Sequence, residues 1–119
     1  IMIEKLKKII EMLDRNKIKY IEKDNKIVID YPFLLSDRNN LIVEIKSKDE
    51  ESYISDAGLF YRTYGIIESK ILDFFSKNNI EFKENELYYK LSSKFIYFDI
   101  EKFVKCLIKA DFLKNGEIK

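Results

Sequence analysis

The chain has 119 residues, of which 46% are hydrophobic and 14% are aromatic. This length suits one domain, and the apolar content is too high for a disordered chain. The 22 Lys and Arg side chains nearly balance the 21 Asp and Glu side chains, which leaves a net charge of +1. A domain of this charge has no overall field that would attract nucleic acid or an anionic membrane. We therefore expect a single globular domain over residues 1–119, with no membrane partner.

Three features of the composition narrow the chemistry further. Histidine is absent, which excludes Ser-His and Cys-His nucleophiles and most zinc sites. The few arginines weigh against sequence-specific reading of DNA, since paired hydrogen bonds to base edges favour arginine. The single cysteine, Cys106, cannot form an internal disulfide and is expected to be a packing residue, so a cytoplasmic location is expected. Charges throughout residues 2–13 predict neither a signal peptide nor a membrane span.

The first half of the chain predicts a helix followed by antiparallel strands. Apolar residues recur at helical spacing in residues 2–15, and Asn16 offers a stop. Alternating apolar residues then predict a hairpin whose second strand covers residues 26–33. A third strand over residues 41–46 follows the Asn39-Asn40 turn and is expected to pair with the strand over residues 26–33. The stretch 48–51 is turn-like and precedes a short fourth strand.

The second half predicts two helices around another hairpin. A helical stripe begins at Ile66 and ends at Asn78, while residues 59–64 carry no clear pattern. Residues 80–91 alternate around a polar turn, and Asp99 is expected to cap the last helix. The predicted fold class is therefore α+β, with an N-terminal helix, antiparallel strands and hairpins, a central helix, a second hairpin and a C-terminal helix. The residues expected to be buried are Ile10, Val43, Ile45, Ile71, Phe75, Phe103 and Leu107.

The order of the motifs resembles one known family. The Tyr-Pro-Phe step at residues 31–33, the strand LIVEI and the run YISDAG at residues 53–58 resemble domain-of-unknown-function family eighteen twenty-eight, over roughly residues 26–110. Members occur in bacteria and their phages, and the resemblance implies a small cytoplasmic domain of phage or mobile-element type with no assigned activity. Family members commonly carry an acidic residue where this chain has Ala57.

The turn Asp56-Ala57-Gly58 has a structural and a functional interpretation. In the structural one, the Asp56 side chain bonds to the backbone two residues on and Gly58 takes a positive φ. In the functional one, Asp56 binds a cation or a cationic partner at the end of the sheet. The sequence offers no second ligand for a cation there, so the structural interpretation is favoured.

The motif Glu44-Ile45-Lys46 is the sharpest candidate for catalysis. Period-two alternation places Glu44 and Lys46 on one face of a strand, and Asp30 lies in the strand expected to pair with it. This pattern resembles the PD-(D/E)xK nucleases, which implies Asp30 and Glu44 as Mg²⁺ ligands and Lys46 as the catalytic cation that positions water. Asp37 is a weaker substitute ligand. Against this, Glu-x-Lys arises easily in a chain with 36% charged residues, and a solvated strand face favours alternating charge.

The aromatic residues favour binding to a protein. The neighbours Tyr88 and Tyr89 cannot both face the core of a strand, and tyrosine buries a large area at interfaces. With Asp56, the expected binding residues are Tyr61, Tyr64, Tyr88, Tyr89 and Tyr97. We expect a non-catalytic module with no cofactor that contacts a protein partner or a second copy, and that acts as a phage or mobile-element factor inhibiting a host defence enzyme. The Mg²⁺-dependent nuclease is the alternative, and single-stranded nucleic acid is the lesser choice of partner.

Overall fold

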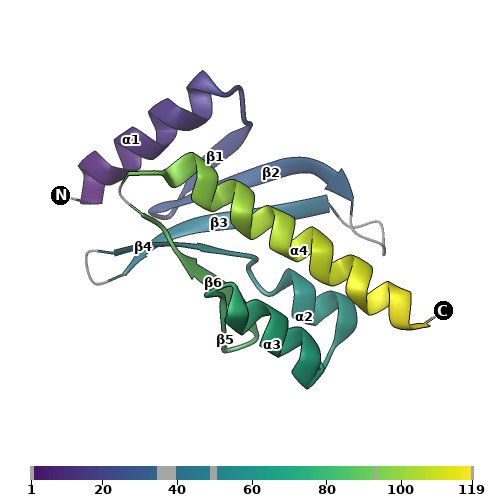
Figure 1. The fold of residues 1–119 in the computed structure, drawn as a ribbon. Helices are drawn as coiled ribbons and strands as arrows, with labels where there is room; N and C mark the ends of the chain where they lie inside the picture. The colour runs from purple at the N-terminus through teal and green to yellow at the C-terminus, as the bar shows by residue number, and fades with distance from the viewer. Residues whose placement is uncertain (1, 35–39, 49–50, 93, 119) are drawn as a thin grey trace.

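The computed structural model in Figure 1 describes residues 2–34, 40–48, 51–92 and 94–118, and the side chains of residues 7–30, 41–47, 51–92 and 94–114. The predicted α+β class is confirmed. The elements in chain order are α1 (Met2–Arg15), β1 (Tyr20–Lys23), β2 (Lys26–Leu34), β3 (Asn40–Lys48), β4 (Glu51–Ser55), α2 (Leu59–Tyr64), α3 (Ser69–Lys77), β5 (Glu81–Lys83), β6 (Glu86–Lys90) and α4 (Ile96–Ile118).

The strands form one antiparallel sheet with the order β1-β2-β3-β4-β6-β5. Both predicted hairpins are present, and the strand over residues 41–46 pairs with β2 as expected. Of the segment expected to be turn-like, residues 48–51, the two ends belong to strands, since Lys48 of β3 pairs with Glu51 of β4, and residues 49–50 lie outside the described residues. Asn39 and Asp37 lie outside the described residues.

One face of the sheet carries the core. Because alternate residues of a strand share a face, β2, β3 and β4 send every second side chain to the same side. These side chains are fully buried: Ile27, Ile29, Leu41, Val43, Ile45 and Ile54. All four helices add to the same cluster, for example through Leu13, Phe60, Phe75 and Phe103, and α4 runs along the sheet in Figure 1. The opposite face carries exposed or half-buried residues, such as Ile42 and Glu44.

Several predicted boundaries change. Residues 59–64, which had no clear pattern, form α2, and the central helix begins at Ser69 rather than Ile66. The last helix begins at Ile96, so Asp99 lies in its first turn instead of capping it. Of the predicted core only Ile10 is wrong, since it is partly buried at the edge of the core. Within the part of the chain that the structure describes, no helix is both long and apolar enough to cross a membrane.

The sequence did not predict that β6, which the chain reaches by a detour, lies beside β4. After β4 the chain forms α2, α3 and β5 before returning as β6, which pairs with β4 on one side and β5 on the other. The second hairpin thus lies at the border of the sheet, but β6, which carries Tyr88 and Tyr89, is the inner of its two strands. Three-residue β5 forms that border, and an edge this short offers little backbone for pairing with another chain.

Removing a core side chain of α4 tests the packing. Leu107 is 2% exposed, so Leu107→Ala leaves a cavity and is expected to lower the free energy of unfolding by about 2 to 5 kcal/mol. Urea unfolding followed by circular dichroism measures the change. Lys105→Ala, on the exposed side of the same helix, is the control, and a Leu107→Ala loss no larger than that of the control would contradict this packing.

Candidate functional site

The Asp56 side chain has a structural role at the turn after β4. Its Oδ1 accepts hydrogen bonds from the backbone N–H groups of Gly58 (2.9 Å) and Leu87 (3.0 Å), and its Oδ2 accepts one from Phe60 (2.9 Å). The residue is 1% exposed. Burial raises the pKa of Asp56 above its ordinary value, although the three backbone hydrogen bonds act in the opposite direction. Asp56 is therefore occupied by the fold, in line with the structural interpretation of the motif.

The backbone of this turn explains the glycine. Ala57 and Gly58 both have positive φ, at 53° and 78°. A Cβ atom at position 58 would lie 3.3 Å from the carbonyl oxygen of Asn85 and 3.0 Å from Nη1 of Arg62. Both the backbone angle and the close approach of the β5–β6 turn thus favour glycine there.

The residues Glu44 and Lys46 belong to an ion-pair network on the open face of the sheet. Lys46 Nζ lies 2.8 Å from a carboxylate oxygen of Glu86 and 3.5 Å from one of Glu44. Ser55 Oγ donates to the same Glu86 oxygen at 2.9 Å, and the Lys46 ammonium lies 5.6 Å from the centre of the Tyr88 ring. Partial burial lowers the pKa of Lys46, but the hydrogen bond and charge of Glu86 outweigh it and raise the pKa above its ordinary value.

Asp30 shares this face but is not the direct neighbour of Glu44. The register pairs Glu44 with Val28 and Asp30 with Ile42, which makes the two carboxylates diagonal neighbours, roughly 7 to 8 Å apart in ordinary sheet geometry. Among the residues whose side chains are described, no group of three His, Cys, Asp or Glu side chains could hold a metal ion. The proposed Mg²⁺ site, with or without Asp37, stays a prediction.

The tyrosines predicted for binding do not converge on one surface. Tyr88 lies on the open face, whereas Tyr89 lies on the helix-covered face and its hydroxyl accepts a hydrogen bond from Lys102 of α4. Tyr64 donates a hydrogen bond to Asp111 of α4, and the ring of Tyr61 lies 6.4 Å from that of Phe82. Tyr97 alone lies beside exposed aromatic residues. Tyr88 and Tyr89 are separated because neighbouring residues of β6 face opposite sides of the sheet. Tyr61 and Tyr64 instead pack against other elements of the fold.

The neighbours of Tyr97 form an exposed cluster at the start of α4, which we call the aromatic surface: Phe95, Tyr97 and Phe98. Phe95 is 60% exposed and Phe98 is 67% exposed. Their ring centres lie 6.3 Å apart, as do those of Tyr97 and Phe98. Of these three residues, the sequence predicted only Tyr97 as a binding residue. The helical stripe that begins with Ile96 and Ile100 could have indicated the other two. Because this stripe faces the core, Phe95 and Phe98 face the solvent.

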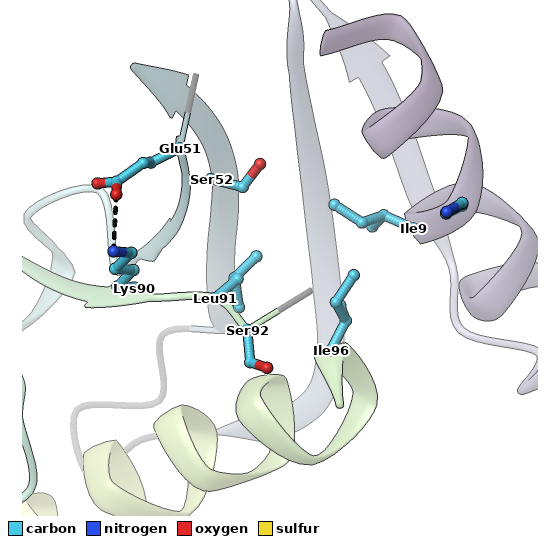
Figure 2. A pocket seen from close by; sticks show the side chains of 8 residues that line it. Ile9, Glu51, Ser52, Lys90, Leu91, Ser92 and Ile96 are labelled. Atoms are coloured by element: carbon cyan, nitrogen blue, oxygen red, sulfur yellow. Dashed lines mark ion pairs between the residues drawn. The ribbon is translucent and has the colours of Figure 1, made fainter. Parts of the chain in front are cut away.

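Two hollows lie along the boundary between α1 and the start of α4. The first, of about 350 Å³, is shown in Figure 2, where Ile9, Leu91 and Ile96 point toward a common space beside Ser52. Its rim includes Lys8 and the ion pair between Lys90 and Glu51, whose Nζ and Oε1 atoms lie 2.7 Å apart.

The second hollow, of about 450 Å³, extends from the first toward the aromatic surface. Its lining includes Met12 and the cations Lys8, Arg15 and Lys94 together with the aromatic surface. Lys8 and Ile96 line both hollows, so the two are adjacent. We call them together the α1–α4 groove. The predicted binding residue Tyr97 lines the second hollow of this groove. Tyr61 lines a separate hollow of about 350 Å³ beside the turn between β5 and β6.

The comparisons with known proteins add no assignment. No protein-family model, no curated protein and no solved structure matches the chain. The resemblance to domain-of-unknown-function family eighteen twenty-eight therefore stays a prediction.

Replacing Asp56 by asparagine tests the hydrogen bonds at the turn. The amide keeps one acceptor oxygen, so at least one of the three buried N–H groups loses its partner. Asp56→Asn is therefore expected to cost about 1 to 3 kcal/mol of unfolding free energy in urea. Asp73→Asn, on the exposed side of α3, supplies the same chemical change as a control. Equal stability of the two variants would show that the Asp56 carboxylate is dispensable.

The pH dependence of Glu86→Gln tests the ion-pair network. Although burial raises the pKa of Glu86, its hydrogen bonds with Lys46 and Ser55 hold the pKa below the ordinary value. A carboxylate whose pKa is lowered in the folded state stabilises the fold at pH values above its unfolded-state pKa. This stabilisation is lost as the pH falls through the folded-state pKa.

The free energy of unfolding of the wild type should therefore exceed that of Glu86→Gln by about 1 kcal/mol near neutral pH. This difference should shrink as the pH falls below the ordinary glutamate pKa of 4.5 and through the lowered folded-state pKa. Urea unfolding across this range measures it. Glu84→Gln, in the neighbouring turn, is the control. A difference that stays constant with pH would mean that the glutamate charge does not stabilise the fold.

Proposed function

We propose that this chain is a non-catalytic module that binds another protein through the aromatic surface. The observation that carries the proposal is the exposure of Phe95 and Phe98, at 60% and 67%, beside half-buried Tyr97. Large aromatic side chains contribute most to protein interfaces, because they bury much area with few rotatable bonds. Grouped exposed aromatics are costly to leave in water without a binding role.

The aromatic surface is also held in place before any partner arrives. The opposite stripe of α4 is buried in the core through Ile100, Phe103 and Leu107, so the start of the helix is fixed against the sheet. The Asp99 carboxylate accepts a hydrogen bond from the backbone N–H of Ser92. This bond links the segment before α4 to the first turn of the helix. A fixed surface loses little conformational entropy when it binds, and this favours affinity.

The absence of histidine from the 119 residues supports the non-catalytic part of the proposal. The Mg²⁺-dependent nuclease remains the alternative prediction. Its lysine, Lys46, is engaged by two carboxylates, Glu86 and Glu44, and this arrangement is equally that of a stabilising network on a solvated strand face. A cytoplasmic location, and action as a phage or mobile-element factor against a host defence enzyme, stay predictions.

Selection from a displayed library of random dodecapeptides tests the proposal. Peptides enriched on the wild-type protein should lose binding to the Phe95→Ser, Phe98→Ser double variant by at least about tenfold, which corresponds to about 1.4 kcal/mol. Both side chains are mostly exposed, so the variant should fold normally. Phe112→Ser, at an equally exposed position of the same helix, 68%, should keep full binding.

The result that would overturn the proposal is a set of enriched peptides that bind the double variant as well as the wild type, or no enrichment at all. Light scattering at high micromolar concentration separates the homodimer form of the prediction from a different partner. A dimer lost in the double variant would make the partner a second copy of this chain.

A further inference from the structure

The α1–α4 groove is more basic than the rest of the molecule. Among the residues whose side chains are described, its lining cations are Lys8, Arg15, Lys90 and Lys94, and its one lining carboxylate, Glu51, is paired with Lys90 at 2.7 Å. No acid is among the described residues that line the second hollow. The whole chain, by comparison, has a net charge of +1. The excess of positive charge is thus local to the groove and complements a negatively charged ligand.

The first hollow provides an apolar end to the same groove. Ile9, Leu91 and Ile96 form its apolar wall, and the Ser52 residue beside them is 7% exposed. A volume of about 350 Å³ is at the lower end of the roughly 300 to 1,000 Å³ range of ligand sites. It suits one or two large apolar side chains better than a bulky cofactor.

From these two features we infer that the groove binds an acidic protein segment, with an apolar side chain of the segment in the first hollow and acidic residues against Lys8 and Arg15. The inference rests on the proposed function and adds the chemistry of the partner. The order along the groove follows from the shared lining: the apolar hollow, then Lys8 and Ile96, then the aromatic surface.

The helix geometry predicts a spacing for the acidic residues. Lys8, Met12 and Arg15 follow each other at intervals of four and three, so they lie on one stripe of α1. Seven residues of helix span roughly 10 Å, and three residues of extended chain cover about the same length. An extended ligand that contacts both cations therefore carries acidic residues about three positions apart.

The rings of the aromatic surface favour a protein ligand over single-stranded nucleic acid. Phe95 and Phe98 are inclined at 59° to each other, and Tyr97 and Phe98 at 66°. Such tilted rings do not offer the successive parallel platforms on which neighbouring bases stack. They do present edges and faces to irregular apolar side chains.

Fluorescence anisotropy with defined probes tests the inference. The main probe is a fluorescein-labelled dodecapeptide of Gly and Ser with glutamates at every third position and one leucine. Matched probes replace the glutamates by lysines or the leucine by serine, and a ten-nucleotide oligothymidylate represents nucleic acid. The main probe should bind the wild-type protein at least about tenfold more tightly than either matched peptide, and its affinity should fall as salt is raised.

Charge-reversal variants connect the binding to the groove. The Lys8→Glu, Arg15→Glu variant should weaken the main probe at least about tenfold. The control Lys105→Glu, Lys109→Glu makes the same change of charge at exposed positions of α4 outside the groove, and it should weaken the probe less than about twofold. Ser92→Trp, at an exposed position that lines the first hollow, should abolish the advantage of leucine over serine. Thermal unfolding of each variant verifies that it folds.

Four results would overturn the inference. Equal binding of the glutamate and lysine probes would show that the ligand need not be acidic. An equal effect of both charge-reversal variants would show that the groove is not the binding site. Tighter binding of oligothymidylate, lost in Lys8→Glu, Arg15→Glu, would make the ligand a nucleic acid. If library peptides still require Phe95 and Phe98 while the acidic probe does not bind, the inference fails and the proposed function stands.

Discussion

The arrangement of the sheet depends on one buried carboxylate, that of Asp56. It lies at the point where β4 ends and the chain leaves the sheet, and it accepts hydrogen bonds from the start of α2 and from Leu87 of β6. The backbone N–H of Asp56 also donates to the Leu87 carbonyl at 3.3 Å. One side chain thus joins three elements that are up to 31 residues apart in the sequence. A buried carboxylate is tolerated because backbone donors satisfy its oxygens, and losing one of them would leave a polar group without a partner in the core.

The position of β6 in turn creates the α1–α4 groove. Since β6 lies directly beside β4, its last residue, Lys90, comes next to Glu51 at the far end of the sheet, and the backbone N–H of Leu91 donates to the Ser52 carbonyl. The chain then passes to the start of α4 close to α1. If β5 instead lay between β4 and β6, it would separate these residues from β4. The surface proposed for binding is therefore a consequence of the same detour through α2, α3 and β5 that Asp56 holds together.

Local patterns in the sequence predicted most of the elements, because each depends on periodicity within one segment. The alternation in residues 26–33 and 41–46 indicated strands and their pairing, and the stripe through Ile71 and Phe75 indicated α3. Pairing between strands that are far apart in the sequence could not be predicted from such local patterns. Pairing of β4 with β6 depends on the Asp56 contacts and on the packing of α2, whose six residues are too short to show a period. Asp99 illustrates the same limit: an Asp before an apolar stripe is typical of a cap, yet the helix begins three residues earlier because Ile96 also packs against the core.

The candidate sites were harder to predict than the fold, and Glu44-Ile45-Lys46 gives the physical reason. A strand with one buried face must carry polar residues at alternate positions on the other face, and opposite charges at such positions attract each other. The pattern of a carboxylate and an ammonium two residues apart is thus favoured by the sheet itself, whether or not a metal binds, and Glu86 of a distant strand completes the network. The α1–α4 groove has the reverse property. Its cations come from three separate parts of the chain, α1, β6 and the approach to α4, and of these described cations Lys90 is the one paired with a residue of the sheet, Glu51. A grouping that the fold does not need is stronger evidence for binding than a motif that the fold produces unaided.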